Sequence, residues 1–463
     1  MTARPRNIVL LVVDSLRASA LTAELPFFAR LARESVHFRR AYASECWTLP
    51  THLSLFTGLL PSEHGAHFQT MAYTRTAPTI AEILAGEGFH TEVVTRNPVF
   101  DGTLPGVTRG FGVNTRVLSP RSGLNPLSLL LAASKPRFRQ QIMSSGFFHP
   151  RQRASREFLT TFAQATLPAD REALRYLLEQ LDARRTAPAP AFFFLNLYDV
   201  HAPYPPAPDS IFRSPWSRRG LDDLLRMPLV MPKLGGHRYL QRGFRMSNAS
   251  RRMLLERYRD AVRLMDAKLA EFYEQAQAAG LLDDTLLIVT SDHGEAFGEH
   301  GLYLHDASVY DTHLHVPLFV RHPDRSPGAV DDVVSTRDLF GLMRAAPRGR
   351  WSETILDTDY RAQRPVAVAE HFHYPRLRDA RAEYRQDLVA LIGAERKLIL
   401  RGAQLESYDL TADPHEQRPS IAPRDDLEPS LRRLSGGGPL GEKLRDHLAR
   451  WRSGPARVDD RAA

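Results

Sequence analysis

Apolar residues along the first two thirds of the chain follow two alternating patterns. Asn7 to Val13 is a continuous, β-branched apolar run, which suits a strand buried on both faces of a parallel sheet. Ala191 to Leu197 and Thr285 to Thr290 are predicted as further buried strands, and Thr91 to Thr95 as a strand. Between them, apolar positions recur at helical spacing over Pro26 to Glu34, Pro78 to Gly86 and Arg251 to Ala279. This alternation of strands and helices predicts a doubly wound α/β sheet.

Two segments interrupt the alternation and set the expected domain organisation. Residues 118–190 and 207–250 are rich in Arg, Pro and Ser and are interpreted as insertions over the core. Beyond about residue 325 the pattern weakens, and Val366 to Ala369, Leu388 to Ile392 and Leu398 to Leu400 are predicted as short antiparallel strands. We therefore expect a large α/β domain over 1–325, a small subdomain over 326–435, and a helix with a polar tail over 436–463.

The composition is that of an ordinary globular protein, with 43% hydrophobic and 25% charged residues among 463. The formal net charge of +8 favours anionic partners. Basic residues are scattered and no aromatic-basic motif stands out, so we expect no nucleic-acid partner. The single cysteine, Cys46, excludes an intramolecular disulfide. The run Ile8 to Val13 has about half the length of a secretory core, and no run spans a bilayer, so we expect a cytoplasmic protein without a transmembrane segment.

Candidate metal ligands stand at the ends of two predicted strands. Asp14 follows the first strand, and Asp292 and His293 follow the run Thr285 to Thr290. In such sheets ligands bind beyond the carboxyl ends of the strands, and two carboxylates with an imidazole suit a divalent ion. The alternative is that an aspartate at a strand end only caps a turn or a helix.

A threonine stands where a nucleophile would be well placed. In the segment CWTLPTHLSLFTG (residues 46–58), Pro50 suits the first turn of a helix and Thr48 stands just before it. A hydroxyl there can bind a metal and attack an electrophile, and a helix N-terminus favours the negative charge of a substrate. The alternative is that Thr48 is only a helix cap.

The order of these motifs resembles that of the sulfatases, a branch of the alkaline phosphatase superfamily. The sulfatase signature has a nucleophile, a proline two residues on, an arginine or histidine four on, and threonine-glycine nine on. Thr48, Pro50, His52 and Thr57-Gly58 reproduce that spacing. Further similar segments follow in the family's order: Asn7 to Asp14, Pro61, His64-Gly65, Tyr258 to Asp266, Ser291 to Gly301, Val316-Pro317-Leu318, Tyr408-Asp409-Leu410 and Asp413-Pro414.

The resemblance implies a fold, a ligand set and roles for further residues. The fold would be an alkaline-phosphatase-like sandwich, with a central, mainly parallel sheet, helices on both faces and a small C-terminal antiparallel subdomain. Asp14, Asp292, His293 and Thr48 would bind one divalent ion, which could be Ca²⁺, Mg²⁺, Mn²⁺ or Zn²⁺. The residues that would complete the site are His52 beside the nucleophile, and His201, His305 and His300 for the anionic ester.

The sequence departs from a classical sulfatase at the reacting position. Sulfatases convert a cysteine or serine there to formylglycine, and Thr48 lacks the chemistry for that conversion. Ser15 replaces a second aspartate, and His305 stands where sulfatases usually carry a lysine. Cys46 is misplaced for the nucleophile, because the second residue after it is Thr48 and not proline.

An unmodified threonine resembles instead the phospho-transfer members of the superfamily. In those enzymes the metal lowers the pKa of the hydroxyl, and a phospho-threonine passes its group to water or to an acceptor alcohol. We therefore expect a hydrolase or transferase of phosphomonoesters or phosphodiesters. The alternatives are a sulfuric ester hydrolase without formylglycine and a silent homologue that binds an anionic ligand. Asp199 and His201 are too close in sequence for the usual second metal site, which favours a single ion.

Overall fold

The computed structural model describes residues 5–117, 170–204, 230, 240, 244, 246–373, 381–423, 427–435 and 438–452. Most of the two predicted insertions, together with the polar tail, therefore lies outside the described residues. No helix in the described ranges has both the length and the apolar character needed to cross a bilayer.

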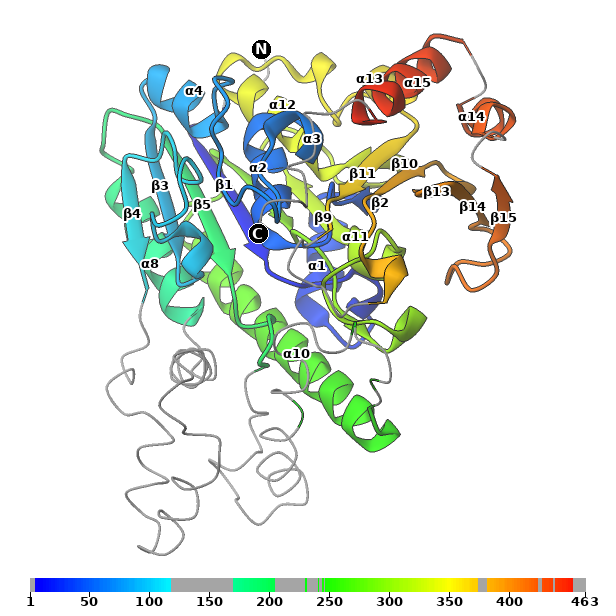
Figure 1. Cartoon of the computed structure of the whole chain (residues 1–463). Coiled ribbons are helices and arrows are strands. Elements are labelled where there is room, and N and C mark those ends of the chain that lie inside the picture. Colours follow the sequence, from blue (N-terminus) through cyan, green and yellow to red (C-terminus); the bar gives the residue numbers. More distant parts are fainter. Residues whose placement is uncertain are drawn as a thin grey trace, which may run out of the picture.

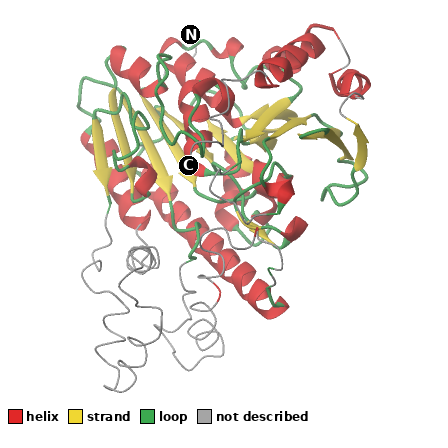
Figure 2. Cartoon of the chain, viewed as in Figure 1, coloured by secondary structure: helices red, strands yellow, loops and turns green. Residues whose placement is uncertain are grey.

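The core is an eight-stranded, mostly parallel sheet (Figures 1 and 2). Across the sheet the order is β10 (Gly328–Ser335), β2 (Val36–Tyr42), β9 (His315–Arg321), β6 (Thr285–Thr290), β1 (Asn7–Val13), β5 (Ala191–Leu197), β3 (His90–Thr95) and β4 (Val113–Arg116). Strand β9 runs antiparallel to both of its neighbours, and the other pairs are parallel. The predicted fold class is confirmed.

Helices cover both faces of this sheet because the central strands are apolar on both sides. On one face, Val9 and Leu11 of β1 share a core with α1 (Pro26–Glu34), α8 (Asp170–Ala183) and α10 (Asn248–Ala278). On the other, Ile8 and Leu10 share a core with α2 (Thr48–Thr57), α4 (Ile80–Gly86) and α12 (Leu339–Ala345). Successive strand residues point to opposite faces, so a continuous apolar run serves two helical layers.

A second sheet of five antiparallel strands packs beside the large one (Figure 1). Its strands, in order, are β11 (Ala367–His371), β12 (Leu388–Ile392), β13 (Arg396–Arg401), β14 (Gln404–Asp409) and β15 (Ser420–Pro423). One face packs against Val316 of β9 and Val333 of β10. The other is covered by α14 (Leu427–Ser435) and α15 (Gly438–Arg452).

Several elements differ from the sequence-based expectation. Strand β10 and helix α12 extend the large α/β unit past residue 325, because their apolar residues Val334 and Leu342 belong to its core. Helix α8 lies within the predicted insertion 118–190, yet its residues Leu174 and Leu177 pack on the large sheet. The remaining short elements are α3 (Pro61–His64), α11 (Asp311–Leu314), α13 (Thr358–Ala362) and the hairpin of β7 (Ala296–Phe297) and β8 (Tyr303–Leu304).

Candidate active site

Neighbouring strand ends bring the predicted metal ligands together. Strands β1 and β6 are adjacent and parallel, with Val12 opposite Thr290, so Asp14 and Asp292 emerge at the same edge of the sheet. One donor atom each from Asp14, Asp292 and His293 lies within 4.8 Å of the others, and all three residues are fully buried. The metal group predicted from the sequence is thus compact in the structure.

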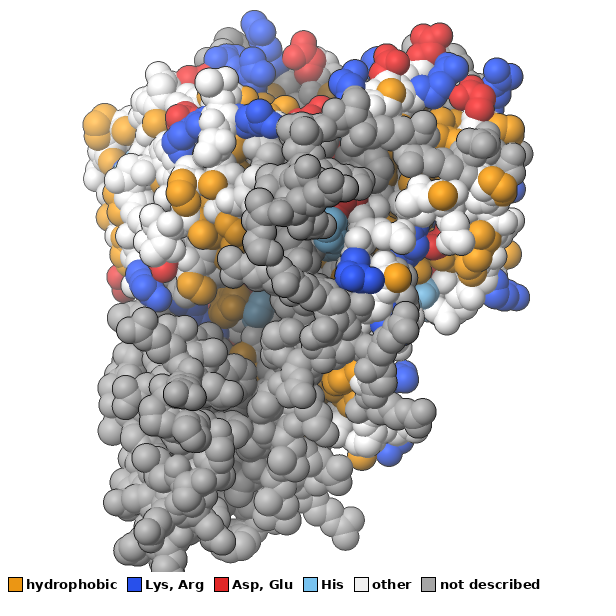
Figure 3. Space-filling model, viewed as in Figure 1, with side chains coloured by type: hydrophobic (Ala, Val, Ile, Leu, Met, Phe, Trp, Pro, Cys, Tyr) orange, Lys and Arg blue, Asp and Glu red, His pale blue; other side chains and the backbone are white. Residues whose placement is uncertain are grey.

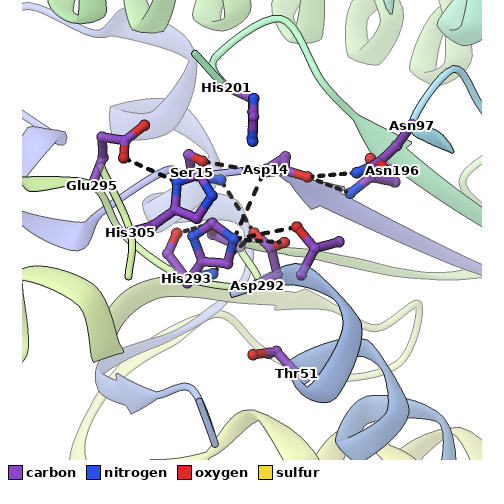
Figure 4. Close-up of polar contacts among 12 residues, drawn as sticks. Asp14, Ser15, Thr51, Asn97, Asn196, His201, Asp292, His293, Glu295 and His305 are labelled. Atoms are coloured by element: carbon purple, nitrogen blue, oxygen red, sulfur yellow. Dashed lines mark hydrogen bonds and ion pairs between the residues drawn. The ribbon is translucent and has the colours of Figure 1, made fainter. Parts of the chain in front are cut away.

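Each carboxylate has one oxygen held by two donors (Figure 4), and Asp14 Oδ1 also accepts from the Ser15 hydroxyl at 3.1 Å. Asp14 Oδ2 accepts hydrogen bonds from the side-chain amides of Asn97 at 3.0 Å and Asn196 at 3.2 Å. Asp292 Oδ1 accepts from the backbone N–H groups of Ser15 and His293 at 3.1 and 2.9 Å. Asp292 Oδ2 is buried and has no hydrogen-bond partner among the described residues.

The pKa shifts of Asp292 and His293, and the tautomer of His293, also fit a bound cation. Burial, and then the charge of Asp14, raise the pKa of Asp292 well above its usual value. His293 Nδ1 lies 3.0 Å from the carbonyl oxygen of Gly294, which leaves the Nε2 lone pair facing the carboxylates. Burial, and then the nearby His305, hold the pKa of His293 well below normal, so the ring is neutral, as a ligand must be. The orphaned Asp292 Oδ2 and the His293 Nε2, 3.3 Å apart, are therefore suitable ligand atoms for a divalent cation.

Thr48 is the first residue of α2, and its hydroxyl points to this group. Its Oγ1 lies 3.4 Å from His293 Nε2, and the side chain is nearly buried. His52, one turn on, places Nδ1 at 2.8 Å from the Thr48 carbonyl oxygen and 3.7 Å from Asp292 Oδ2. Burial lowers the pKa of His52 to about 4, so this ring is neutral and supports the backbone of Thr48 rather than its hydroxyl. Thr51, by contrast, points its hydroxyl to the carbonyl of Glu45.

Two of the three predicted anion-binding histidines lie at the same site. The His305 ring stacks on His293 with centroids 4.4 Å apart, and His201 lies 4.9 Å from His305. Burial disfavours a charge on His305, but Glu295, whose Oε1 is 3.0 Å from its Nδ1, raises the pKa to about 10. Burial lowers the pKa of His201. The site therefore offers an imidazolium beside a neutral imidazole.

His300 and Asp199 are placed elsewhere. His300 has a left-handed backbone (φ 51°), and its ring stacks at 3.8 Å on Tyr310, which in turn contacts Tyr408 of β14. The structure therefore does not bring His300 to the group around Asp14. Asp199, considered for a second ion, forms buried ion pairs with Arg96 and Lys268. Those two cations already neutralise the negative charge with which Asp199 would have to bind a second metal ion.

Sequence analysis missed the residues that hold the ligands in place. Asn97 stands two residues after β3, Asn196 lies near the end of β5, and Glu295 stands two residues after His293. Each belongs to the same edge of the sheet as Asp14. A polar residue at the carboxyl end of each strand was the signal that could have identified them.

Comparison with known proteins agrees with this site. The sulfatase family profile matches residues 6–343, which include every residue of the group described above, and the chain belongs to the sulfatase family. Mouse iduronate 2-sulfatase is 23% identical over 369 residues, covering 72% of this chain and 63% of that protein. The chain thus aligns with somewhat less than two thirds of the length of this curated relative.

Solved structures share the fold over nearly the whole chain. The phosphonate monoester hydrolase of Agrobacterium radiobacter superposes with a TM-score of 0.62 at 19% identity, covering 97% of this chain and 96% of the other. BT4656, solved with its substrate D-glucosamine-2-N,6-O-disulfate, superposes with a TM-score of 0.63 at 14% identity, covering 97% and 98%. The same fold therefore occurs in a phosphonate ester hydrolase and in a protein that binds a sulfated sugar.

Proposed function

We propose that this chain is a metal-dependent hydrolase or transferase of phospho-esters that uses Thr48 as its nucleophile. The observation that carries the proposal is the position of the Thr48 hydroxyl, 3.4 Å from His293 Nε2 and beside Asp14 and Asp292. Family membership supports ester chemistry at this site. The choice of phosphorus over sulfur comes from position 48, because threonine cannot become an aldehyde hydrate.

The four candidate ligands, Asp14, Thr48, Asp292 and His293, would hold the ion. A divalent cation bound there would lower the pKa of the adjacent hydroxyl and offset negative charge on the ester's oxygens. Thr48 itself supplies the oxygen that bonds to phosphorus while the bond to the leaving oxygen breaks. Its place at the start of α2 lets the unbonded N–H groups of the first helical turn face the anionic ester.

His305 and His201 would bind the rest of the ester. The imidazolium of His305, held by Glu295, would donate to an anionic oxygen or to the leaving oxygen. The neutral His201 would add a hydrogen bond without a charge. The phosphoryl group on Thr48 would then pass to water or to an acceptor alcohol, which regenerates the hydroxyl.

A sulfuric ester hydrolase is the second candidate, favoured by the family match and by the relatives that cleave sulfate esters. A sulfated threonine lacks the second hydroxyl of the formylglycine hydrate, whose collapse expels sulfate without attack at sulfur. Threonine therefore disfavours the sulfatase route by its chemistry, whereas the anion-binding residues serve either ester.

The test is a comparison of kcat/KM for matched aryl phosphate, aryl phosphodiester and aryl sulfate substrates. We expect a clear preference for one of the phospho-esters, and a radiolabelled phosphoryl group trapped on Thr48 by acid quench. Thr48→Ala should reduce kcat by at least about 10³-fold, whereas Thr48→Ser should keep measurable turnover.

The matched control is Thr51→Ala in the same helix, because the Thr51 hydroxyl bonds to the backbone of Glu45 and does not reach the ligands. If the enzyme prefers the aryl sulfate, and mass spectrometry shows Thr48 to be unmodified, the sulfuric ester hydrolase is the correct function. Metal binding without turnover of any of the three esters would indicate a silent homologue.

A further inference from the structure

A second group of buried donor side chains lies apart from the candidate active site. Glu45 and Cys46 belong to the loop between β2 and α2, and His371 is the last residue of β11 in the small sheet. One donor atom of each lies within 4.8 Å of the others. Glu45 and Cys46 are fully buried, and His371 is 2% exposed. The proposed role of the Asp14 group does not involve any of them.

The contacts within this trio leave polar atoms unsatisfied. His371 Nδ1 lies 2.8 Å from Glu45 Oε1 and 3.6 Å from Cys46 Sγ. Glu45 Oε1 also accepts the Cys46 backbone N–H at 3.0 Å. Glu45 Oε2 and His371 Nε2 have no hydrogen-bond partner in the described part of the chain. Buried polar atoms are normally paired, so the unpaired Glu45 Oε2 is the atom of this trio that is open to a ligand.

The distances fit a small tetrahedral ion. With about 2.3 Å from zinc to sulfur and about 2.0–2.1 Å from zinc to nitrogen, sulfur and nitrogen ligands stand about 3.6 Å apart. The Cys46 Sγ to His371 Nδ1 distance is 3.6 Å. Glu45 Oε1 is too close to Nδ1 to share a tetrahedron with it unchanged, so Oε2 is the carboxylate atom left for the ion.

We propose that Glu45, Cys46 and His371 form a Zn²⁺ site with three protein ligands, separate from the ion of the active site. A thiolate and an imidazole select zinc over magnesium or calcium. Carboxylate and thiolate together carry two negative charges, which balance a divalent ion in a buried place. On binding, the thiol proton leaves to solvent, and the Nδ1 proton of a neutral His371 moves to Nε2. Three protein donors leave one tetrahedral position for a water.

The site would fasten together segments that are distant in sequence. Cys46 and His371 are separated by 325 positions, and Cys46 stands two residues before Thr48. An ion here would cross-link the loop that precedes the nucleophile to the small sheet. Its removal should therefore lower thermal stability and loosen the start of α2, without removing any ligand of the active-site ion.

The single cysteine makes the test specific. Full-length protein is stripped with a chelator and titrated with Co²⁺, which gives a near-ultraviolet charge-transfer band only when a thiolate is a ligand. Because Cys46 is the only cysteine in the chain, that band can come from no other residue. We expect the band to saturate when one of the two Co²⁺ ions per chain is bound by the thiolate, to be displaced by Zn²⁺, and to accompany a rise in Tm.

Two variants separate this site from the active site. Asp292→Ala should lose the active-site ion and keep the charge-transfer band, whereas Cys46→Ser should lose the band and keep the other ion. Elemental analysis should accordingly fall from two ions per chain to one in each variant. If folded wild-type protein shows no band and binds no second ion, the trio is a hydrogen-bonded Glu–His–Cys cluster and the proposal is wrong. The band is read without any substrate, so failure of the proposed phospho-ester chemistry would leave it unchanged.

Discussion

Asn97 and Asn196 supply the sharpest test of the metal site, because both donate to the same oxygen of Asp14. Their side-chain amides lie 3.0 and 3.2 Å from Asp14 Oδ2, which holds Oδ1 toward His293. A hydrogen bond to a charged group contributes about 1.5–3 kcal/mol. Loss of a partner of this kind typically weakens metal binding by about 10–100-fold. We therefore expect Asn196→Ala and Asn97→Ala each to raise the metal Kd by about 10–100-fold.

The double variant should lose more than the two single effects combined. After one amide is removed, the other still fixes the Asp14 carboxylate, but removal of both leaves a buried oxygen with neither donor. Residues that share one partner usually show such coupling, of about 0.5–3 kcal/mol. Calorimetric titration of metal-free protein with Mn²⁺ measures each Kd, and the metal dependence of kcat/KM gives a second reading.

Asn114→Ala is the matched control, since its amide donates to the Phe100 carbonyl at 2.6 Å and not to Asp14. Asn97 also caps the backbone N–H of Val99, so Tm without metal must be measured alongside. If both single variants and the double variant bind Mn²⁺ as tightly as wild type, Asp14 is not a metal ligand and the reasoning fails.

Two further predictions concern the scaffold of the site. Gly294→Ala would place a methyl group 2.1 Å from the Thr312 carbonyl oxygen, so we expect a clearly lower Tm and weaker metal binding. The control Gly86→Ala, where the added methyl group meets open space, should fold normally. Lys268→Ala removes a buried cation from Asp199 and should lower the unfolding free energy by about 3–5 kcal/mol in urea titrations. The control Lys443→Ala, at an exposed position, should leave the unfolding free energy near that of wild type. Equal stability of the two variants would contradict the role of the buried pair.

Strong apolar patterns made the middle of the sheet predictable. The runs at β1, β5 and β6 coincide with the observed strands, because each is buried on both faces and its few polar residues lie at or near the ends of the run. Strands β2 and β10 lie at one edge of the sheet and include exposed or half-exposed charged residues, so their sequences show neither a continuous apolar run nor a helical spacing of apolar residues. In β9, Pro317 interrupts an apolar run in a way that argues against a central strand.

The candidate metal ligands could be selected from the sequence, but the contacts that other residues make with them could not be. Asp14, Asp292 and His293 are identified by their own positions at strand ends, before any neighbour is known. The contacts of Asn97 and Asn196 with Asp14 depend on the order β1, β5, β3 across the sheet, and sequence alone does not give that order. His300 lies outside this group, with a left-handed backbone and with its ring stacked on Tyr310, and neither feature can be read from the sequence.

The face of the protein in Figure 3 shows basic and acidic side chains interspersed over its described part. The net charge of +8 is therefore not gathered there into one patch, and recognition of an anionic ester falls to the buried site. There, two cations would face the ester: the proposed metal ion and the imidazolium of His305, which is paired with Glu295. The charge that would bind the ester is local, and it depends on Glu295 and on the metal ligands.

His305 and Thr48 depart from the sulfatase pattern in different ways. An ordinary histidine is mostly neutral at pH 7, so replacing a lysine by His305 would normally discard a positive charge. Here Glu295, whose other oxygen accepts from the Tyr204 hydroxyl at 3.0 Å, overcomes the cost of burial and raises the pKa of His305 to about 10. The cation is thus retained in a planar ring stacked on His293. At position 48, by contrast, threonine does not replace the function of the aldehyde hydrate. The change in chemistry therefore falls on Thr48, the proposed nucleophile, and it is the ground for proposing phosphorus over sulfur.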